Sequence, residues 1–292
     1  MKMFTAPDSR FLVPYDGSFR VADMATSSPD ADEKSDEKRL RDATEKLDVL
    51  QQALFANDRH AVLLVFQGMD AAGKDSTIRA VMQGINPAGC QVYAFKKPSD
   101  EELDHDFLWR TSRVMPERGR FGIFNRSHYE EVLVVRVHSQ ILDSQQLPDT
   151  INRATIWEER FESIRDMEKH LARNGTVILK FWLNVSRDEQ RKRFLARLDD
   201  ADRHWKFNPR DLAERRKWAE YMDAYEEALN ATSRPWAPWY ALPADDKPFM
   251  RARIAEILVE ALQGIGLTYP QPSASDRALF DQSRKELTEA GG

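Results

Sequence analysis

Apolar runs and helical patterns alternate along the chain. Residues 61–66 (AVLLVF) and 176–185 (TVILKFWLNV) are apolar nearly throughout, which is typical of strands that are buried on both faces of a parallel sheet. Residues 38–55 instead carry leucine and alanine at helical spacing, which predicts an amphipathic helix. Shorter strands are predicted at residues 91–95, 121–124 and 239–242.

Residues that are typical of helix ends indicate where the helices between these strands begin and end. Ser99 precedes Glu102 in a capping-box pattern, which predicts a helix that runs to residue 114. Asn174-Gly175 marks the end of a helix that is predicted from residue 151. Further helices are predicted at residues 78–82, 130–137, 209–229 and 249–262, and after Ser186. Strands separated by helices predict a doubly wound α/β fold with right-handed crossovers.

The ends of the chain differ from its middle. Residues 1–38 are rich in proline and polar residues and are expected to form an N-terminal arm or linker with little core of its own. Residues 39–270 contain all the periodic segments and are expected to form the catalytic domain, with a lid at about residues 187–217. Residues 271–292 are expected to form a C-terminal tail.

Composition and charge exclude several classes of protein. The chain has 292 residues, of which 41% are hydrophobic, enough for one substantial core. Its net charge of −5 disfavours non-specific binding of nucleic acid or membrane by the chain as a whole. A single cysteine, Cys90, excludes an internal disulfide, and no apolar run approaches the ~20 residues of a membrane span. We therefore expect a cytoplasmic protein without a nucleic-acid or membrane partner.

A phosphate-binding loop is predicted directly after the first buried strand. Residues 68–74 (GMDAAGK) match the pattern G-x-x-x-x-G-K, and a helical pattern follows them, as this motif requires. Glycine lets backbone N–H groups turn inward, the helix N-terminus adds partial positive charge, and Lys74 reaches the outer phosphates. The residues expected to bind phosphate or nucleotide are Gly68, Ala71, Ala72, Gly73, Asp75, Ser76, Thr77 and Asn125.

Two carboxylates make this loop unusual. Asp70 lies inside the loop, and Asp75 stands where serine or threonine normally follows the lysine. Each would repel a phosphate chain by ~1–4 kcal/mol at about 4 Å, so a divalent cation between them is expected. Asp70 is the first candidate ligand for Mg²⁺. Asp75 either ligates the metal, caps the helix or holds a water molecule, and the sequence leaves these alternatives open.

A second group of polar residues follows the strand at residues 121–124. Asn125, Arg126 and Glu130 would lie at the carboxyl edge of the sheet, where ligands bind in open α/β folds. Arg126 is suited to neutralise a transferring phosphoryl group, and Glu130 to hold metal or water. Asn125 is a weaker metal ligand than the usual aspartate. His128 is expected to be a hydrogen-bonding side chain. The alternative is a polar helix start with solvated charges.

Positive charge is concentrated at residues 187–217. This stretch has eleven lysines and arginines against seven acids, a local net charge of +4. It is either a solvated helical face or a basic lid that closes over phosphates. The aromatic residues near its end are expected to pack lid helices against the body rather than to stack on a base. They are Trp205, Trp218, Tyr221 and Tyr225.

Five blocks of sequence together resemble the family-2 polyphosphate kinases. They are GMDAAGKDST (68–77), FNRSHYEEVLVVRVH (124–138), DEQRKRF (188–194), WKF (205–207) and APWYALPADDK (237–247). The resemblance covers residues 39–269 and implies a P-loop kinase-like three-layer sandwich, with a mostly parallel sheet, helices on both faces and a helical lid. It further implies Mg²⁺-dependent phosphoryl transfer between inorganic polyphosphate and nucleoside mono- or diphosphates, by a homo-oligomer (dimer or tetramer).

Carried onto this sequence, the resemblance assigns roles to four residues. Asp70 becomes a Mg²⁺ ligand, Lys74 the phosphate clamp and Arg126 a catalytic arginine, with Glu130 near metal and nucleotide. Another subgroup has aspartate where Asn125 stands, which puts metal ligation there in doubt. The form NRSHYEE is more similar to subgroups that act on ADP, or on AMP and ADP. A basic channel for polyphosphate would be lined by Lys96, Arg110, Arg113, Arg191, Arg197, Arg203 and Lys206.

Two other functions compete with this one. An ATP-dependent nucleoside monophosphate kinase of the thymidylate kinase type would share the fold and act without polyphosphate. A nucleotide-binding regulator would bind without turnover. The two carboxylates in the loop disfavour the first, and the presence of both Arg126 and Glu130 disfavours the second. Which nucleotide is the acceptor, and how long the polyphosphate is, stay open.

Overall fold

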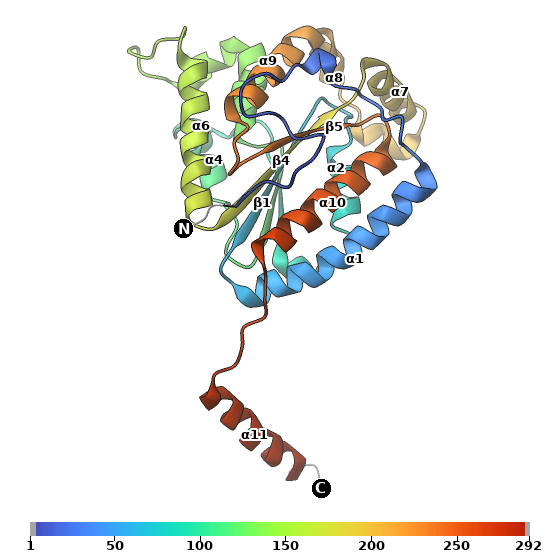
Figure 1. The fold of residues 1–292 in the computed structure, drawn as a ribbon. Coiled ribbons are helices and arrows are strands. Elements are labelled where there is room, and N and C mark those ends of the chain that lie inside the picture. Colours follow the sequence, from blue (N-terminus) through green and yellow to red (C-terminus); the bar gives the residue numbers. More distant parts are fainter. Residues whose placement is uncertain (1–3, 290–292) are drawn as a thin grey trace.

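The computed structural model describes residues 4–289, and a five-stranded parallel sheet forms its centre (Figure 1). The strands lie in the order β2-β3-β1-β4-β5, and each neighbouring pair is parallel. Their bounds are β1 (Ala61–Gln67), β2 (Cys90–Ala94), β3 (Phe121–Asn125), β4 (Thr176–Asn184) and β5 (Trp239–Pro243). The predicted doubly wound α/β fold is therefore present, and each predicted strand is found.

Helices cover both faces of the sheet and complete three layers (Figure 1). One layer contains α1 (Glu33–Asn57), α2 (Lys74–Val81) and α10 (Lys247–Ile265), and the other contains α6 (Ile156–Arg173) and α9 (Trp218–Thr232). The lid region holds α7 (Arg187–Leu198), a 3₁₀ helix at Ala201–Lys206 and α8 (Arg210–Arg216). The shorter helices are α3 (Asp100–Leu103), α4 (Trp109–Ser112) and α5 (Val134–Val137), with 3₁₀ turns at Val21–Asp23, Pro87–Gly89, His128–Val132 and Ser139–Gln145.

The apolar runs of the sequence become the core of the sheet. Every residue of β1 and of β4 is buried, as expected for strands with a helix layer on each side. Phe66 and Phe181 pack side by side on neighbouring strands, with 5.3 Å between ring centroids. Burying a side chain of this size stabilises the fold by about 1.5–3 kcal/mol. The polar residues that follow these strands are thereby fixed at one edge of the sheet.

The segment before α1 packs against the sheet. Val13 donates its backbone N–H to the carbonyl of Trp239, and Ala241 donates to the carbonyl of Phe11. Phe11 and Val13 are both buried. The expectation of little core in this arm is wrong for these residues, because the edge strand β5 has backbone groups that need partners and the arm supplies them. The division of the chain at residues 38 and 270 stays a prediction.

Several predicted helices are shorter than their patterns, or broken. The capping box at Ser99 is present, but α3 ends at Leu103 and α4 begins only at Trp109. The Asp106 side chain accepts the Leu108 N–H between these two helices. Such local bonds compete with helix formation. The predicted helix 209–229 is divided at Lys217, helix 130–137 begins as a 3₁₀ turn, and helix 151–171 begins only at Ile156.

The last described helix, α11 (Ala274–Glu289), stands away from the rest of the molecule (Figure 1). It has no buried residue, and an extended segment joins it to α10. Over residues 4–289, none of the helices combines the length and the apolar character that a membrane crossing requires.

Candidate active site

The predicted phosphate loop connects β1 to α2. Gly68 has φ +151°, and a Cβ at this position would lie 2.8 Å from the carbonyl oxygen of Leu183, so a side chain does not fit. Gly73 and Ala71 also have positive φ, of 107° and 62°. These turns let the backbone N–H groups of the loop face a common centre at the N-terminus of α2, which is the arrangement that binds phosphate.

Lys74 lies beneath this loop with its ammonium group on the loop carbonyls. Its Nζ donates to Gly68 O at 2.6 Å and to Met69 O at 3.2 Å, and the residue is buried. Burial, and then the nearby charge of Arg126, lower the pKa of Lys74 to about 8. The ammonium therefore remains protonated at neutral pH and is held where loop-bound phosphates need a cation.

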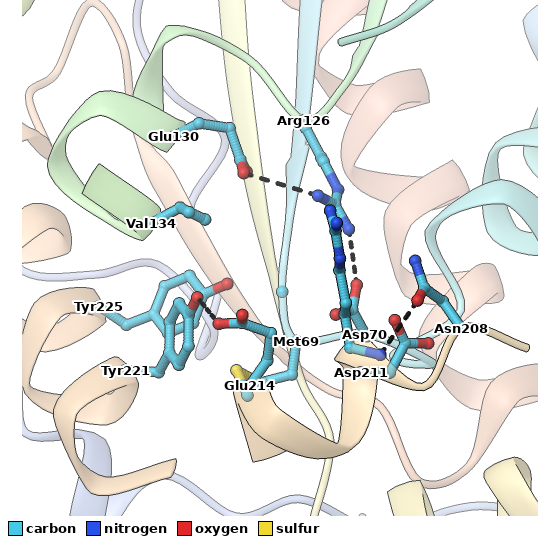
Figure 2. Close-up of a pocket in the computed structure, with 12 residues that line it drawn as sticks. Met69, Asp70, Arg126, Glu130, Val134, Asn208, Asp211, Glu214, Tyr221 and Tyr225 are labelled. Carbon is cyan, nitrogen blue, oxygen red and sulfur yellow. Dashed lines mark hydrogen bonds and ion pairs between the residues drawn. The ribbon is translucent and has the colours of Figure 1, made fainter. Parts of the chain in front are cut away.

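Arg126 lies between two carboxylates, as Figure 2 shows. Its guanidinium is 2.6 Å from Asp70 Oδ1 and 3.7 Å from Glu130 Oε2. Glu130, foremost, and Asp70 raise the pKa of Arg126 above its ordinary value, against the effect of burial. The backbone of Arg126 has φ +64°, in the left-handed region, where a non-glycine residue is held only by its surroundings. The structure thus brings together three of the four predicted catalytic residues, and Lys74 lies at the same loop.

Asp75 contacts the second group of polar residues. Asn125 at the end of β3 donates its amide to Asp75 Oδ1 at 2.5 Å. The first turn of α2 is therefore tied to the neighbouring strand end, and no side chain caps this helix. The Ser76 hydroxyl donates back to Gly73 O at 3.0 Å, whereas the buried Thr77 hydroxyl has no partner in the part of the chain that the structure describes.

A cavity of about 230 Å³ opens beside the loop (Figure 2). Loop, strand end and lid all contribute to its wall, which holds two guanidinium groups (Arg126 and Arg210) and two tyrosines (Tyr221 and Tyr225). Its carboxylates are Asp70, Glu130, Asp211 and Glu214. Burial and the charge of Asp70 raise the pKa of Asp211 to about 6. An acidic wall next to a phosphate loop is compatible with an anionic ligand only when a cation accompanies that ligand.

The carboxylates at the cavity suit a metal ion that takes most of its ligands from water and phosphate rather than from the protein. Between residues 4 and 289, no three His, Cys, Asp or Glu side chains are grouped to hold a metal by themselves. Mg²⁺ is usually bound by one or two carboxylates together with water and phosphate oxygens. Asp70 and Glu130 both face the cavity and provide such oxygens. A divalent cation therefore fits here together with a phosphate ligand.

Two lid residues that the sequence analysis did not single out support the loop. Arg193 is nearly buried and donates to the carbonyls of Ala71 and Ala72 at 3.0 and 2.9 Å, and to Ala244 and Asp245 at 2.7 and 3.1 Å. Gln190 donates to Asp70 O at 2.8 Å. Arg193 and Arg197 are four residues apart and lie on the same face of α7. The sequence pattern alone therefore does not show which arginine of this helix is buried.

The residues predicted for a polyphosphate channel lie elsewhere. None of the seven lines the cavity. Most form local contacts, among them Arg191 with Asp188 at 3.7 Å and Arg203 with Asp200 at 2.7 Å. Three more form ion pairs: Arg110 with Glu102, Arg113 with Glu101 and Arg197 with Asp211. The ammonium of Lys206 lies over the Trp205 ring, and the backbone carbonyl of Lys96 accepts a hydrogen bond from Arg110. Their role in a channel stays a prediction.

The lid aromatics are only partly as expected. Tyr221 and Tyr225 are buried as predicted, and they also line the cavity. Trp218 is partly buried against the core. The prediction for Trp205 is wrong, because its side chain is 78% exposed. It lies within the 3₁₀ helix at Ala201–Lys206, which has no buried residue.

Behind Arg126 and Glu130 lies a buried polar cluster. Lys180 on β4 donates to Glu168 Oε2 at 2.7 Å and to the Tyr129 hydroxyl at 2.8 Å, and Tyr129 donates to Glu168 Oε1 at 2.8 Å. His128 is buried beside it, and within residues 4–289 neither of its ring nitrogens has a hydrogen-bond partner. The prediction of a hydrogen-bonding histidine is wrong, since its closest acid, Glu168, is 3.8 Å away.

Comparison with known proteins agrees with this geometry. The family described as Polyphosphate kinase 2 matches residues 30–267. The chain is 54% identical over 249 residues to an ADP-polyphosphate phosphotransferase of Rhodopseudomonas palustris (85% of this chain, 86% of that one). It is 41% identical over 276 residues to an AMP/ADP-polyphosphate phosphotransferase of Meiothermus ruber (93% and 99%).

A solved structure matches over nearly the whole chain. Polyphosphate Kinase 2 from Arthrobacter aurescens TC1 superposes with a TM-score of 0.85 at 37% identity, and the match covers 97% of this chain and 99% of that one. The predicted P-loop kinase-like three-layer fold is thereby confirmed. The chain belongs to the Polyphosphate kinase 2 family.

Proposed function

We propose that this protein transfers a phosphoryl group reversibly between inorganic polyphosphate and a nucleoside diphosphate, with ADP and ATP as the principal pair. One observation carries the assignment: Arg126 is held between Asp70 and Glu130 at a cavity that also meets the loop over Lys74. The relative of R. palustris, described as acting on ADP, supports ADP as acceptor. The M. ruber relative, described as acting on AMP and ADP, makes a nucleoside monophosphate a second acceptor to test.

The residues at the site perform alignment and charge neutralisation. The loop N–H groups and Lys74 hold the terminal phosphates of the donor, and the acceptor phosphate enters the cavity beside Arg126. Arg126 neutralises charge on the phosphoryl group as it moves between the two, which is the main requirement of phosphoryl transfer. An acceptor phosphate oxygen is already an anion near neutral pH, so we assign no general base. Because one anhydride bond replaces another, the direction follows the concentrations of the substrates.

A divalent cation is generally expected for phosphotransferases, and we propose Mg²⁺ with Asp70 and Glu130 as its protein ligands. When bound, it would neutralise phosphate oxygens that otherwise face four carboxylates. We expect Asp70→Asn to lose turnover, because the variant removes the ligand charge and one partner of Arg126. A wild-type rate for Asp70→Asn would place the metal elsewhere.

A direct assay tests the reaction. The protein is incubated with ADP, MgCl₂ and long-chain polyphosphate, and ATP is followed by chromatography. We expect ATP from the wild type, none from Lys74→Ala, and a wild-type rate from the matched control Lys285→Ala on the detached α11. Absence of ATP from the wild type would refute the proposal. Phosphorylation of a nucleoside monophosphate by ATP without polyphosphate would favour the rival monophosphate kinase.

We infer further that the enzyme works in the cytoplasm as a homo-oligomer (dimer or tetramer), without a membrane or nucleic-acid partner. The family resemblance supports the oligomer, and the net charge of −5 supports the absence of a nucleic-acid partner. Light scattering of the purified protein measures the number of subunits, and a monomeric mass would overturn this part.

A further inference from the structure

One carboxylate in the wall of the cavity is held in place by two aromatic side chains. Oε2 of Glu214 on α8 accepts a hydrogen bond from the Tyr221 hydroxyl at 2.5 Å and lies 2.7 Å from His138 Nε2. Burial, and then the hydrogen bond to Glu214, raise the pKa of Tyr221 above its ordinary value, so the phenol keeps its proton and is the donor. The Glu214 carboxylate therefore has a fixed position at the cavity.

His138 also joins this carboxylate to the end of α5. Its Nδ1 lies 3.4 Å from Gln140 Nε2, a donor, which places the ring proton on Nε2, where it faces Glu214. Close by, the Lys217 ammonium donates to the carbonyl of Val137 at 3.1 Å. The end of α8 is thus held to the end of α5 at two points, and the Glu214 side chain is kept from turning away from the cavity.

The second carboxylate oxygen, Glu214 Oε1, is left for a ligand. Within the described part of the chain, no hydrogen bond or ion pair engages this atom. The side chain is 28% exposed and lines the cavity. In Figure 2, Val134, Tyr221 and Tyr225 lie across the cavity from Arg126. A ligand that fills the cavity therefore meets a guanidinium on one side, and a carboxylate among aromatic and apolar side chains on the other.

This arrangement matches the two parts of a nucleotide. Phosphate oxygens are charged acceptors, so Arg126 attracts them and Glu214 repels them. The ribose hydroxyls are uncharged and can donate to a carboxylate oxygen. A carboxylate binds ribose hydroxyls in the same way in dinucleotide-binding folds. Every unit of a phosphate chain is charged, so the Glu214 side of the cavity suits a nucleoside and disfavours a second polymer.

We propose that Glu214 recognises the acceptor as a nucleotide by accepting a hydrogen bond from a ribose hydroxyl, and that His138 is a positioning residue that holds this carboxylate. The site rests on the polyphosphate-dependent reaction proposed above and adds the group by which the enzyme selects its acceptor. With the acceptor phosphate beside Arg126, the ribose extends toward α8 and α9. A nucleotide gains the contact with Glu214, whereas a phosphate chain in the same position is repelled.

Acceptors that lack one hydroxyl test the site. With long-chain polyphosphate at saturation, kcat/KM is measured for ADP, 2′-deoxy-ADP and 3′-deoxy-ADP. In the wild type we expect at least one deoxy analogue to lie about tenfold or more below ADP, as for the loss of a hydrogen bond to a charged group. In Glu214→Ala the value for ADP should fall to that of the analogue. The matched control Glu162→Ala, which removes an exposed glutamate from α6, should keep the wild-type preference.

Two variants of His138 test the positioning role. His138→Ala should weaken the preference for the ribose hydroxyl, and His138→Gln should restore it, because the glutamine amide can donate from the position of Nε2. The midpoint of thermal unfolding, measured on the same samples, shows that each variant is folded. A merely structural role would lower kcat/KM for ADP and for both analogues by the same factor, and this result would overturn the role of His138.

Binding without turnover gives a second measurement. Calorimetry gives the Kd of ADP and of the deoxy analogues, and the difference between them should disappear in Glu214→Ala. An unchanged preference in Glu214→Ala, with a higher Mg²⁺ concentration for half-maximal rate, would overturn the proposal and make Glu214 a metal ligand. If the wild type makes no ATP from ADP and polyphosphate, the proposed function fails. If it makes ATP and treats the three acceptors alike, only the Glu214 site fails.

Discussion

Lys74 links the protonation state of one buried side chain to the rate of the proposed reaction. Its pKa of about 8 means that the free enzyme carries a charged clamp at neutral pH and loses that charge as the pH rises. We therefore expect kcat/KM for polyphosphate to be level up to about pH 8 and to fall about tenfold per unit above it, since kcat/KM reports the free enzyme. Initial rates at subsaturating polyphosphate measure this. A level profile to about pH 9.5 would contradict it.

The sequence predicts which side chains gather at the loop and at the strand end, but it does not predict the residues that support them. Asp70, Lys74, Arg126 and Glu130 lie in a loop and at a strand end, and both features can be recognised from residue types and short-range pattern. Arg193 cannot be recognised in this way, because its contacts are with carbonyls 51 and 121 residues away. His128 fails for the same reason: its neighbours come from α6 and β4, which no local pattern brings together.

At the scale of elements, Arg193 makes α7 a support for the phosphate loop. Arg193→Gln would leave several buried carbonyls without a donor, so we expect a loss of about 2–4 kcal/mol in the free energy of unfolding and a raised KM for polyphosphate. Chemical denaturation measures the first effect. Arg191→Gln is the matched control on the same helix for the denaturation measurement, and its free energy of unfolding should equal that of the wild type because Arg191 is 62% exposed. Equal stability of both variants would rule out this role.

The buried Lys180–Glu168 pair joins β4 to α6 behind the strand end. Glu168→Gln would leave the Lys180 ammonium buried without its counter-ion, and we expect a loss of about 3–5 kcal/mol in unfolding free energy. In Lys180→Met/Glu168→Leu the loss should be smaller than in Lys180→Met or Glu168→Leu alone, because no buried charge remains in the double variant. A double-mutant cycle by denaturation measures the difference. Additive losses would show that the two groups do not interact.

Whether a segment forms a strand or a helix can be predicted here where burial determines the pattern of apolar residues. The strands β1 and β4 are buried on both faces, and their mainly apolar sequences indicate this even though Lys180 interrupts the apolar run of β4. Helix lengths are less predictable, because a side chain such as that of Asp106 bonds to the local backbone and interrupts a helical pattern that would otherwise continue. Lys217, at the break between α8 and α9, donates its ammonium to the carbonyl of Val137, a contact with a distant segment that no local pattern reveals.

At the scale of the whole molecule, α11 adds nothing to the packed body. Because none of its residues is buried, removal of residues 271–292 should leave the midpoint of thermal unfolding within about 1 °C and kcat unchanged. Differential scanning calorimetry and the ATP assay measure these. A large fall in the midpoint would indicate that α11 has a packing partner in solution.

The pairing of the early segment with β5 also bears on how the molecule is made. Phe11 and Val13 find their backbone partners at Trp239 and Ala241, more than two hundred positions later in the chain. During synthesis this segment cannot pair until β5 has left the ribosome, by which time nearly all of the sheet has emerged. Contacts between residues so distant in sequence also form slowly. The segment therefore leaves the ribosomal tunnel long before β5 does, and it is among the last parts of this domain to reach its native position.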